Sequence, residues 1–455
     1  MGKKAKQQAN WSDPNTTAEN EVLPKWLKWI WTGRGIGYSL NVVLILQLTY
    51  YCTDILGMAP ALVGTLLLAS KVFDGFTDLI AGTIIDKTHS RWGKARPYDI
   101  FLPLMWIGTV LLFSVPNFGT VGKAVYIFIT YALVNAVCNT FLMAADPVFL
   151  GRTIRKEENR ISLTAFQGAF IMIFSILVNV LLPQFIAGIG STKAGWTIIA
   201  LAFAVPLSIV GSLRMLTVKE ILTAEDEVKQ ESIPLKKALC LAGKNKLAIL
   251  LCVMTILANA ITSVNSAVQS YYFKWIFGDI SLASLISLPA FLTPVLLIFA
   301  PKIANKYGSG FLLKLGMVCS VIGYVLRWIF GANLITIMAG AIFTTIGTVP
   351  ISMLLSIYTL ECIDYGERKT GERVEGFVSA MMGFGTKVGS GVGSAVVGFL
   401  MGISGYISSE VATTQTEGAL NMIKFLFGGA PFIMALIMLL LSISFVKVDS
   451  AVSKQ

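Results

Sequence analysis

Charged residues are scarce in this sequence. They make up 13% of its 455 positions, whereas 55% of the residues are hydrophobic and the mean hydropathy is strongly positive. A water-soluble protein of this size needs far more polar surface to face the solvent. The composition therefore excludes a soluble globular protein and predicts an all-α, polytopic membrane protein.

Histidine and paired cysteines are scarce as well. The only histidine is His89, and the six cysteines form no close pair and no Cys-x-x-Cys motif. Zinc sites, disulfide frameworks and Ser-His-Asp catalysis therefore lack the side chains they require. Because an ATP-binding loop is also missing, we expect neither an enzyme nor a cofactor beyond a coupling sodium ion or proton.

Apolar windows of about 20 residues, the length that crosses roughly 30 Å of hydrocarbon, recur throughout the chain. We predict twelve spans, at residues 34–54, 60–85, 99–116, 122–148, 161–187, 194–216, 246–275, 280–301, 311–330, 333–360, 376–403 and 421–446. A polar linker at 219–245 separates two six-helix halves, 34–218 and 246–447, with tails at 1–33 and 448–455. This is the architecture of a major facilitator transporter, whose substrate site lies between the halves.

The net charge of +11 comes from bases in alternate loops rather than from one patch. Basic clusters follow the second span, at 87–96, and the fourth span, at 152–160. This distribution argues against nucleic acid as a partner. By the positive-inside rule we expect both termini in the cytoplasm, and we expect a monomer in the cell membrane.

Two acids stand out in the second span. Asp74 and Asp78 are four residues apart, so they share one helix face, and Lys71 lies on that face one turn earlier. A carboxylate in hydrocarbon costs about 2.5–3.5 kcal/mol, so the pair needs a common purpose or partner. We interpret it as a cation site, while structural pairing with Lys71 and Lys387 remains the alternative.

Other polar residues inside spans suggest a cavity. The first span contains Asn41, the fourth ends in Asp146 beside Pro147, and the eleventh carries Lys387 among glycines. Ionisable groups within a membrane mark substrate or ion pathways more often than lipid-facing surface. For Asp146, a cavity role and a satisfied position at a helix break are both open.

Two long motifs in this order resemble the glycoside-pentoside-hexuronide:cation symporters, and the likeness covers nearly the whole chain. The first is Asp74-x-x-x-Asp78 running into Asp86-x-Thr-x-Ser-Arg-Trp-Gly-Lys-x-Arg-Pro. The second is Asp364-Tyr-Gly-Glu-x-Lys-Thr-Gly-x-Arg-x-Glu-Gly, followed eleven residues later by Lys387. The resemblance implies that Asp74 and Asp78, with Thr77 between them, bind the cation and that Lys387 neighbours it.

The sequence also departs from the melibiose-type pattern. Tyr38 replaces the sugar-binding acid of the first helix, Phe149 stands near the aromatic platform and Gln167 near the arginine of the fifth helix. The fourth-helix acid falls one residue late, on Asp146. Because one residue turns a helix by about 100°, Asp146 takes over that role only where the helix is locally irregular.

From the resemblance, the departures from it and the charges of the loops, we expect two further sets of residues. The expected substrate contacts are Tyr38, Asn41, Asp146, Phe149, Gln167 and Lys387. The expected cytoplasmic gate contains Asp86, Arg91, Arg96, Asp364 and Arg373.

We therefore expect a secondary active transporter that imports a glycoside, pentoside or related sugar with sodium or a proton by alternating access. Its partners would be the sugar, the cation and the lipid bilayer. The alternatives are a transporter of the same fold that carries an amphiphile or lysolipid, and a membrane sensor that no longer transports.

Overall fold

The computed structural model of the chain describes residues 21–88, 90–221, 245–370, 375–407 and 414–452. Within these ranges every regular element is helical. Most of the expected N-terminal tail and linker, and Arg373 of the expected gate, lie outside the described residues.

The chain divides into two compact units. The first comprises residues 1–51 and 69–229, and the second comprises residues 52–68 and 230–455. The second unit therefore includes the end of the first expected span and the beginning of the second.

The first unit contains nine helical elements and the part of α4 that follows residue 68. They are α2 (Lys25–Ile45), α3 (Leu48–Tyr50), α4 (Pro60–Asp86), η3 (Arg96–Ile100), α5 (Phe101–Leu112), α6 (Thr120–Ala132), η4 (Leu133–Asn139), α7 (Thr140–Thr153), α8 (Glu157–Ile189) and α9 (Lys193–Thr217).

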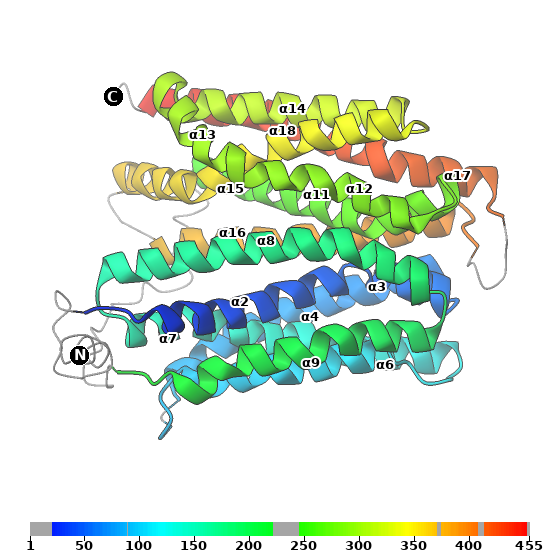
Figure 1. Cartoon of the computed structure of the whole chain (residues 1–455). Coiled ribbons are helices and arrows are strands. Elements are labelled where there is room, and N and C mark those ends of the chain that lie inside the picture. The colour runs from blue at the N-terminus through cyan, green and yellow to red at the C-terminus, as the bar shows by residue number, and fades with distance from the viewer. Residues whose placement is uncertain (1–20, 89, 222–244, 371–374, 408–413, 453–455) are drawn as a thin grey trace. The chain divides into compact units, whose positions relative to one another are not determined.

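Helix α2 is the centre of this unit, with α8 and α9 packed along it (Figure 1). The close approach of α9 requires a glycine, because a Cβ atom on Gly37 would lie 3.2 Å from the backbone oxygen of Leu207. The polar residues of α2 are consequently buried among helices and can be matched by groups on α5, α7 and α9.

The second unit contains the first part of α4, up to residue 68, and the remaining elements, except that Tyr51 of η2 belongs to the first unit. They are η2 (Tyr51–Ile55), α11 (Lys246–Ile276), η6 (Ile280–Leu282), α12 (Ala283–Ser287), η7 (Leu288–Leu292), α13 (Thr293–Tyr307), α14 (Ser309–Ile329), α15 (Leu334–Thr370), α16 (Glu375–Ile403), α17 (Glu417–Lys424), η8 (Phe425–Gly429) and α18 (Ala430–Val452).

Within this unit α16 packs on α11, and α14 packs on both α15 and α18 (Figure 1). A Cβ atom on Gly389 would lie 2.3 Å from the backbone oxygen of Ile256, so the glycine allows the backbones of α16 and α11 to meet. Leu251, Met317, Tyr358 and Phe445 belong to one apolar core that joins α11, α14, α15 and α18.

Two expectations from the sequence change. Among the described residues nine helical stretches are long and apolar enough to cross a membrane, so the count of twelve spans is not confirmed. The tenth span was expected to end at residue 360, whereas α15 continues as a helix through the acidic motif to Thr370. Glutamate, arginine and lysine are good helix formers, which accounts for this continuation.

Candidate functional site

Asp74 lies on α4 and is 1% exposed. Its Oδ2 pairs with the Nζ atom of Lys71 at 3.4 Å, and its Oδ1 accepts a hydrogen bond of 3.2 Å from the Thr140 hydroxyl. The Lys71 ammonium also lies 5.9 Å from the ring centroid of Tyr131. A buried carboxylate is thus held by one cation and one hydroxyl within the first unit.

The other two residues of the expected cation site are less informative. Thr77 donates its hydroxyl to the backbone oxygen of Asp74 at 2.9 Å, which leaves the lone pairs of Oγ1 free to accept. The backbone of Asp78 continues α4 one turn further, but its side chain lies outside the described residues.

A π-helical turn in the fourth expected span positions the groups that face Asp74 and Tyr38. This turn, η4, ends at Asn139, and α7 begins at Thr140. Asn139 accepts a hydrogen bond of 2.7 Å from the Tyr38 hydroxyl, while Thr140 donates to Asp74. Because π-helical turns are often found at functional sites, this irregularity is itself a pointer to the region.

Four charged side chains form a buried network beside Tyr38. Arg214 of α9 bonds both oxygens of Asp99 at 2.5 and 2.7 Å and Oδ1 of Asp146 at 2.5 Å. Arg34 of α2 lies 3.4 Å from the same Asp146 oxygen and 3.7 Å from Asp99. Two guanidinium groups and two carboxylates therefore balance one another among α2, η3, α7 and α9.

This network answers the question of helix register at Asp146. Helix α7 is continuously α-helical from Thr140 to Thr153, so the irregularity required at Asp146 is absent there. The carboxylate is paired with Arg34 and Arg214 and is 28% exposed. The contacts favour a satisfied structural position over a cavity ligand, but the position is an ion pair within a continuous helix and not a helix break.

The side chains of the remaining expected substrate contacts in the first unit differ in how exposed they are. Asn41 is 1% exposed and donates to the Thr109 hydroxyl at 2.7 Å, and Phe149 is completely buried with its ring 5.4 Å from that of Trp31. Tyr38 and Gln167 are half-buried. A sugar can reach these two side chains with less disturbance of the packing.

Lys387 belongs to the second unit, on α16, and is half-buried. It lies two residues after Gly385 and two before Gly389, which pack on α11. Since two residues turn a helix by about 200°, Lys387 lies on the opposite side of α16 from this contact.

The expected gate residues are only partly described. Arg96 donates through Nε to the backbone oxygen of Met215 at 2.7 Å and through Nη2 to that of Leu216 at 3.2 Å, so it caps the end of α9. Arg91 and Asp364 are exposed. The side chains of Asp86 and Arg373 lie outside the described residues.

Glu220 is a functional candidate that sequence reasoning missed. It accepts hydrogen bonds from the backbone N–H groups of Lys94, Ala95 and Arg96 at 2.7–2.9 Å and pairs with Arg152 at 2.9 Å. One carboxylate thereby connects the loop after α4, the end of α7 and the segment after α9. The sequence signal for this role is an acid that directly follows the sixth expected span and is expected on the same side of the membrane as two basic loops.

A second missed cluster lies in the second unit around Asp54. This side chain accepts hydrogen bonds of 2.9 Å from Lys274 and 2.6 Å from the Tyr406 hydroxyl. Burial, together with the Asp54 carboxylate, raises the pKa of Tyr406 above its ordinary value, so the hydroxyl stays protonated and donates. Asp54 itself is 1% exposed.

The comparisons with known proteins now define the class. The family model described as MFS/sugar transport protein matches residues 36–450, and this chain belongs to that family. It is therefore a multi-pass membrane transporter rather than an enzyme.

Among curated relatives, the chain is 29% identical to the isoprimeverose transporter of Lactiplantibacillus pentosus, over 85% of this chain and 82% of the relative. It is 26% identical to the glucuronide carrier protein homolog of Escherichia coli, with coverage of 84% and 85%. It is also 26% identical to a putative glycoside/cation symporter of Escherichia coli, with coverage of 85% and 84%.

A crystal structure of a D-xylose-proton symporter resembles this chain with a TM-score of 0.64 at 14% identity, covering 90% of this chain and 96% of that one. At this identity the likeness shows a shared fold and nothing finer.

Proposed function

We propose that the chain imports a glycoside, pentoside or related sugar together with a sodium ion or a proton by alternating access. The observation that carries the proposal is the buried Asp74 carboxylate on α4, held by Lys71 and Thr140 in a member of a sugar transport family. The names of the relatives, an isoprimeverose transporter and a glycoside/cation symporter, support the same substrate class.

These contacts provide a mechanism that couples cation binding to sugar binding. In the empty site Lys71 neutralises Asp74, and Asp78 lies one helical turn further along α4. An arriving sodium ion or proton replaces the lysine as the partner of the carboxylate, which frees the ammonium to move. Rearrangement of α4 then changes the sugar site, with a coupling of about 1–3 kcal/mol between the two ligands.

Oxygen ligands suit a sodium ion at this position. Besides the Asp74 carboxylate, the Thr140 hydroxyl bonds its Oδ1 atom and the Thr77 hydroxyl bonds the Asp74 backbone oxygen, so three kinds of oxygen lie in this part of α4 and α7. A proton would need the carboxylate alone. The structure of the site is compatible with both ions, and the test below separates them.

The sugar contacts we propose first are Tyr38, Gln167 and Lys387, because these side chains are half-buried. Asp146, Asn41 and Phe149 would contact a sugar only after the ion pairs and packing around them open. For the cytoplasmic gate we retain Asp86, Arg91, Arg96, Asp364 and Arg373, with both termini on the cytoplasmic side and a monomer as the working unit.

The test is uptake by the full chain in proteoliposomes. Labelled isoprimeverose, methyl xyloside, methyl glucoside and methyl glucuronide are offered under an inward sodium gradient, a lithium gradient or a proton gradient. We expect accumulation of at least one sugar with one cation, and loss of accumulation in Asp74→Asn. Glu158→Gln is the control, because its carboxylate is 80% exposed on α8.

Removal of an acid makes membrane insertion easier, so failure of Asp74→Asn to accumulate sugar cannot be attributed to topology. Accumulation at the wild-type level in Asp74→Asn would refute the cation site. Competition by lysolipids but not by sugars would instead favour the amphiphile transporter, and the absence of any uptake would favour the sensor.

A further inference from the structure

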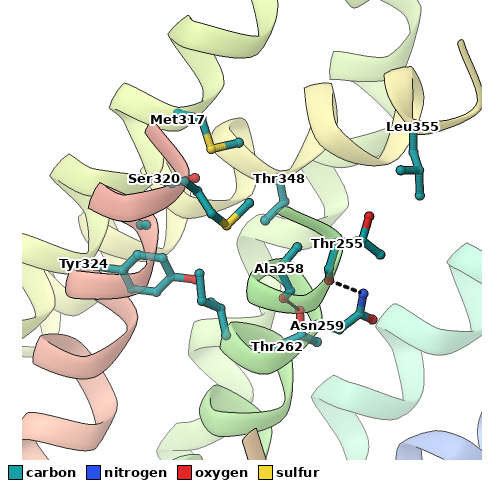
Figure 2. A pocket seen from close by; sticks show the side chains of 12 residues that line it. Thr255, Ala258, Asn259, Thr262, Met317, Ser320, Tyr324, Thr348 and Leu355 are labelled. Carbon is teal, nitrogen blue, oxygen red and sulfur yellow. Dashed lines mark hydrogen bonds between the residues drawn. The ribbon is translucent and has the colours of Figure 1, made fainter. Parts of the chain in front are cut away.

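The second unit contains a cavity of about 250 Å³ that none of the expected site residues lines. It lies among α11, α14, α15 and α18, and Figure 2 shows Asn259, Ser320, Tyr324 and Thr348 around it. Every lining residue is uncharged, and half of them carry a hydroxyl or an amide. A purely apolar membrane core has no need of so many polar groups at one place.

Most of these polar groups present acceptors to the cavity. The hydroxyls of Thr255, Thr262 and Thr348 donate to backbone oxygens of their own helices at 2.8–3.0 Å. Asn259 likewise donates its amide to the backbone oxygen of Thr255, which Figure 2 marks with a dashed line. The threonine protons are committed, so their oxygen lone pairs remain for a ligand, whereas the Asn259 amide keeps its oxygen and one N–H.

Two buried hydroxyls supply donors. Ser320 is 5% exposed, and its hydroxyl makes no hydrogen bond to another described residue. The Tyr324 hydroxyl, on a side chain 4% exposed, accepts from the Asn265 amide at 3.1 Å and keeps its own proton. The Ser320 hydroxyl therefore remains able to bond a ligand atom that enters the cavity.

The size and lining fit a single sugar ring. The volume lies just below the range of about 300–1,000 Å³ that is usual for larger ligands. Met317, Leu355 and Met438 offer apolar surface to the C–H faces of a pyranose, and the polar groups match hydroxyls, which both donate and accept.

A sugar acid does not fit the same lining. A carboxylate only accepts hydrogen bonds, and here it would face threonine oxygens whose protons are already donated, with neutral donors from Asn259, Ser320 and Tyr324 and no cationic residue in the wall. Arg327, one turn beyond Tyr324, does not line the cavity; its Nη2 donates to Thr344 at 2.9 Å.

We propose that this cavity is a subsite for an uncharged glycosyl group and that it makes the transporter select neutral glycosides over uronates. The inference rests on the proposed sugar transport, whose substrate class it narrows. Thr348 and Thr262 are exposed and form the accessible side of the cavity, whereas Ser320 and Tyr324 form its buried end.

Two variants test the subsite in the full chain. Ala258→Leu fills the cavity, and Thr348→Val removes one hydroxyl with little change of shape. The controls are Thr359→Val, another hydroxyl on α15 that donates to its own helix, and Ser442→Ala, a fully buried hydroxyl on α18. Neither control residue lines the cavity.

Uptake in proteoliposomes and equilibrium binding to purified protein are measured with methyl glucoside, isoprimeverose and methyl glucuronide. We expect Thr348→Val to raise the KM for the neutral sugars about threefold to tenfold, the range for one lost hydrogen bond. Ala258→Leu should abolish saturable binding, while both controls match the wild type. Size-exclusion profiles show whether each variant is folded.

The outcomes separate this inference from the proposed function. Neutral-sugar uptake that neither Ala258→Leu nor Thr348→Val alters would overturn the subsite and leave sugar transport intact, as would preference for the glucuronide. Binding of neutral sugars that is lost in Ala258→Leu without any uptake would uphold the subsite and refute transport. Absence of both uptake and binding refutes both.

Discussion

At the scale of single residues, the proposed cation site depends on the partners of Asp74. Lys71 holds Oδ2 from 3.4 Å and is itself only partly exposed, so its charge competes directly with an incoming cation. The Thr140 hydroxyl on the other oxygen carries no charge and does not compete in this way.

Lys71→Met therefore should strengthen cation binding. Without the ammonium the site keeps its acids and gains net negative charge, so a cation at the same place is attracted more strongly. We expect the sodium or proton concentration for half-maximal sugar binding to fall at least about tenfold, which corresponds to about 1.4 kcal/mol.

Lys87→Met is the matched control for this measurement, because Lys87 is exposed beyond the end of α4. An unchanged or weakened cation dependence in Lys71→Met would show that Lys71 supports the site instead of competing for it.

At the scale of elements, the network of Arg34, Asp99, Asp146 and Arg214 joins four elements of the first unit. Arg214 and Asp99 are completely or almost completely buried, so their charges depend on each other. The guanidinium of Arg214 also lies 4.5 Å from the ring centroid of Trp31 and 4.7 Å from that of Phe149. Packing and charge thus hold the same junction.

Asp99→Asn should destabilise the folded protein strongly. The change leaves two buried guanidinium groups with one carboxylate, and removal of one partner from a buried pair costs about 3–5 kcal/mol. We expect a clear fall of the unfolding temperature in detergent, while Glu158→Gln, which affects an exposed pair, leaves it unchanged. A wild-type unfolding temperature in Asp99→Asn would show that water replaces the lost charge.

Arg96 also connects two elements, because it begins η3 and bonds the end of α9. Its bonds to the backbone oxygens of Met215 and Leu216 hold two segments of the first unit together. Arg96→Ala should slow transport severalfold, because gate residues set the rate of conformational change. The ratio of uptake rates between methyl glucoside and methyl xyloside should stay the same, and a changed ratio would assign Arg96 to the sugar site.

At the scale of the whole molecule, the sequence predicted the class of protein well, because composition and two long motifs carry that information. It also singled out Asp74 as a candidate, since an acid within an apolar window is visible without a structure. It could not predict the partners of that acid, because Thr140 and Asn139 owe their places to a π-helical turn in an unremarkable apolar stretch.

The same limit explains what was missed in both units. Arg214 lies within an apolar window, and its meaning depends on Asp99, which is 115 residues away in the chain. The cavity in the second unit is lined by isolated serine, threonine and asparagine residues of ordinary helices. Only the packing of four helices brings these residues together, and the hydropathy of the sequence does not predict which helices pack against one another.

Lys387 gives the last prediction, because coupling is a property of the complete transporter. If this lysine is only a counter-charge, Lys387→Ala leaves the acids more negative, so the cation binds more tightly and the sugar affinity keeps its dependence on the cation. If it bonds the sugar or holds the acids in the coupled geometry, the same change uncouples the two ligands. We expect uncoupling, because an ammonium inside a membrane span costs about as much to insert as either acid and is retained for a function.

The measurement is sugar affinity with and without the coupling cation, in the wild type and in Lys387→Ala. A coupling of about 1–3 kcal/mol corresponds to a ratio of about 5–150 between the two affinities, and this ratio should fall to about 1 in the variant. Retention of the wild-type ratio would assign Lys387 a structural role.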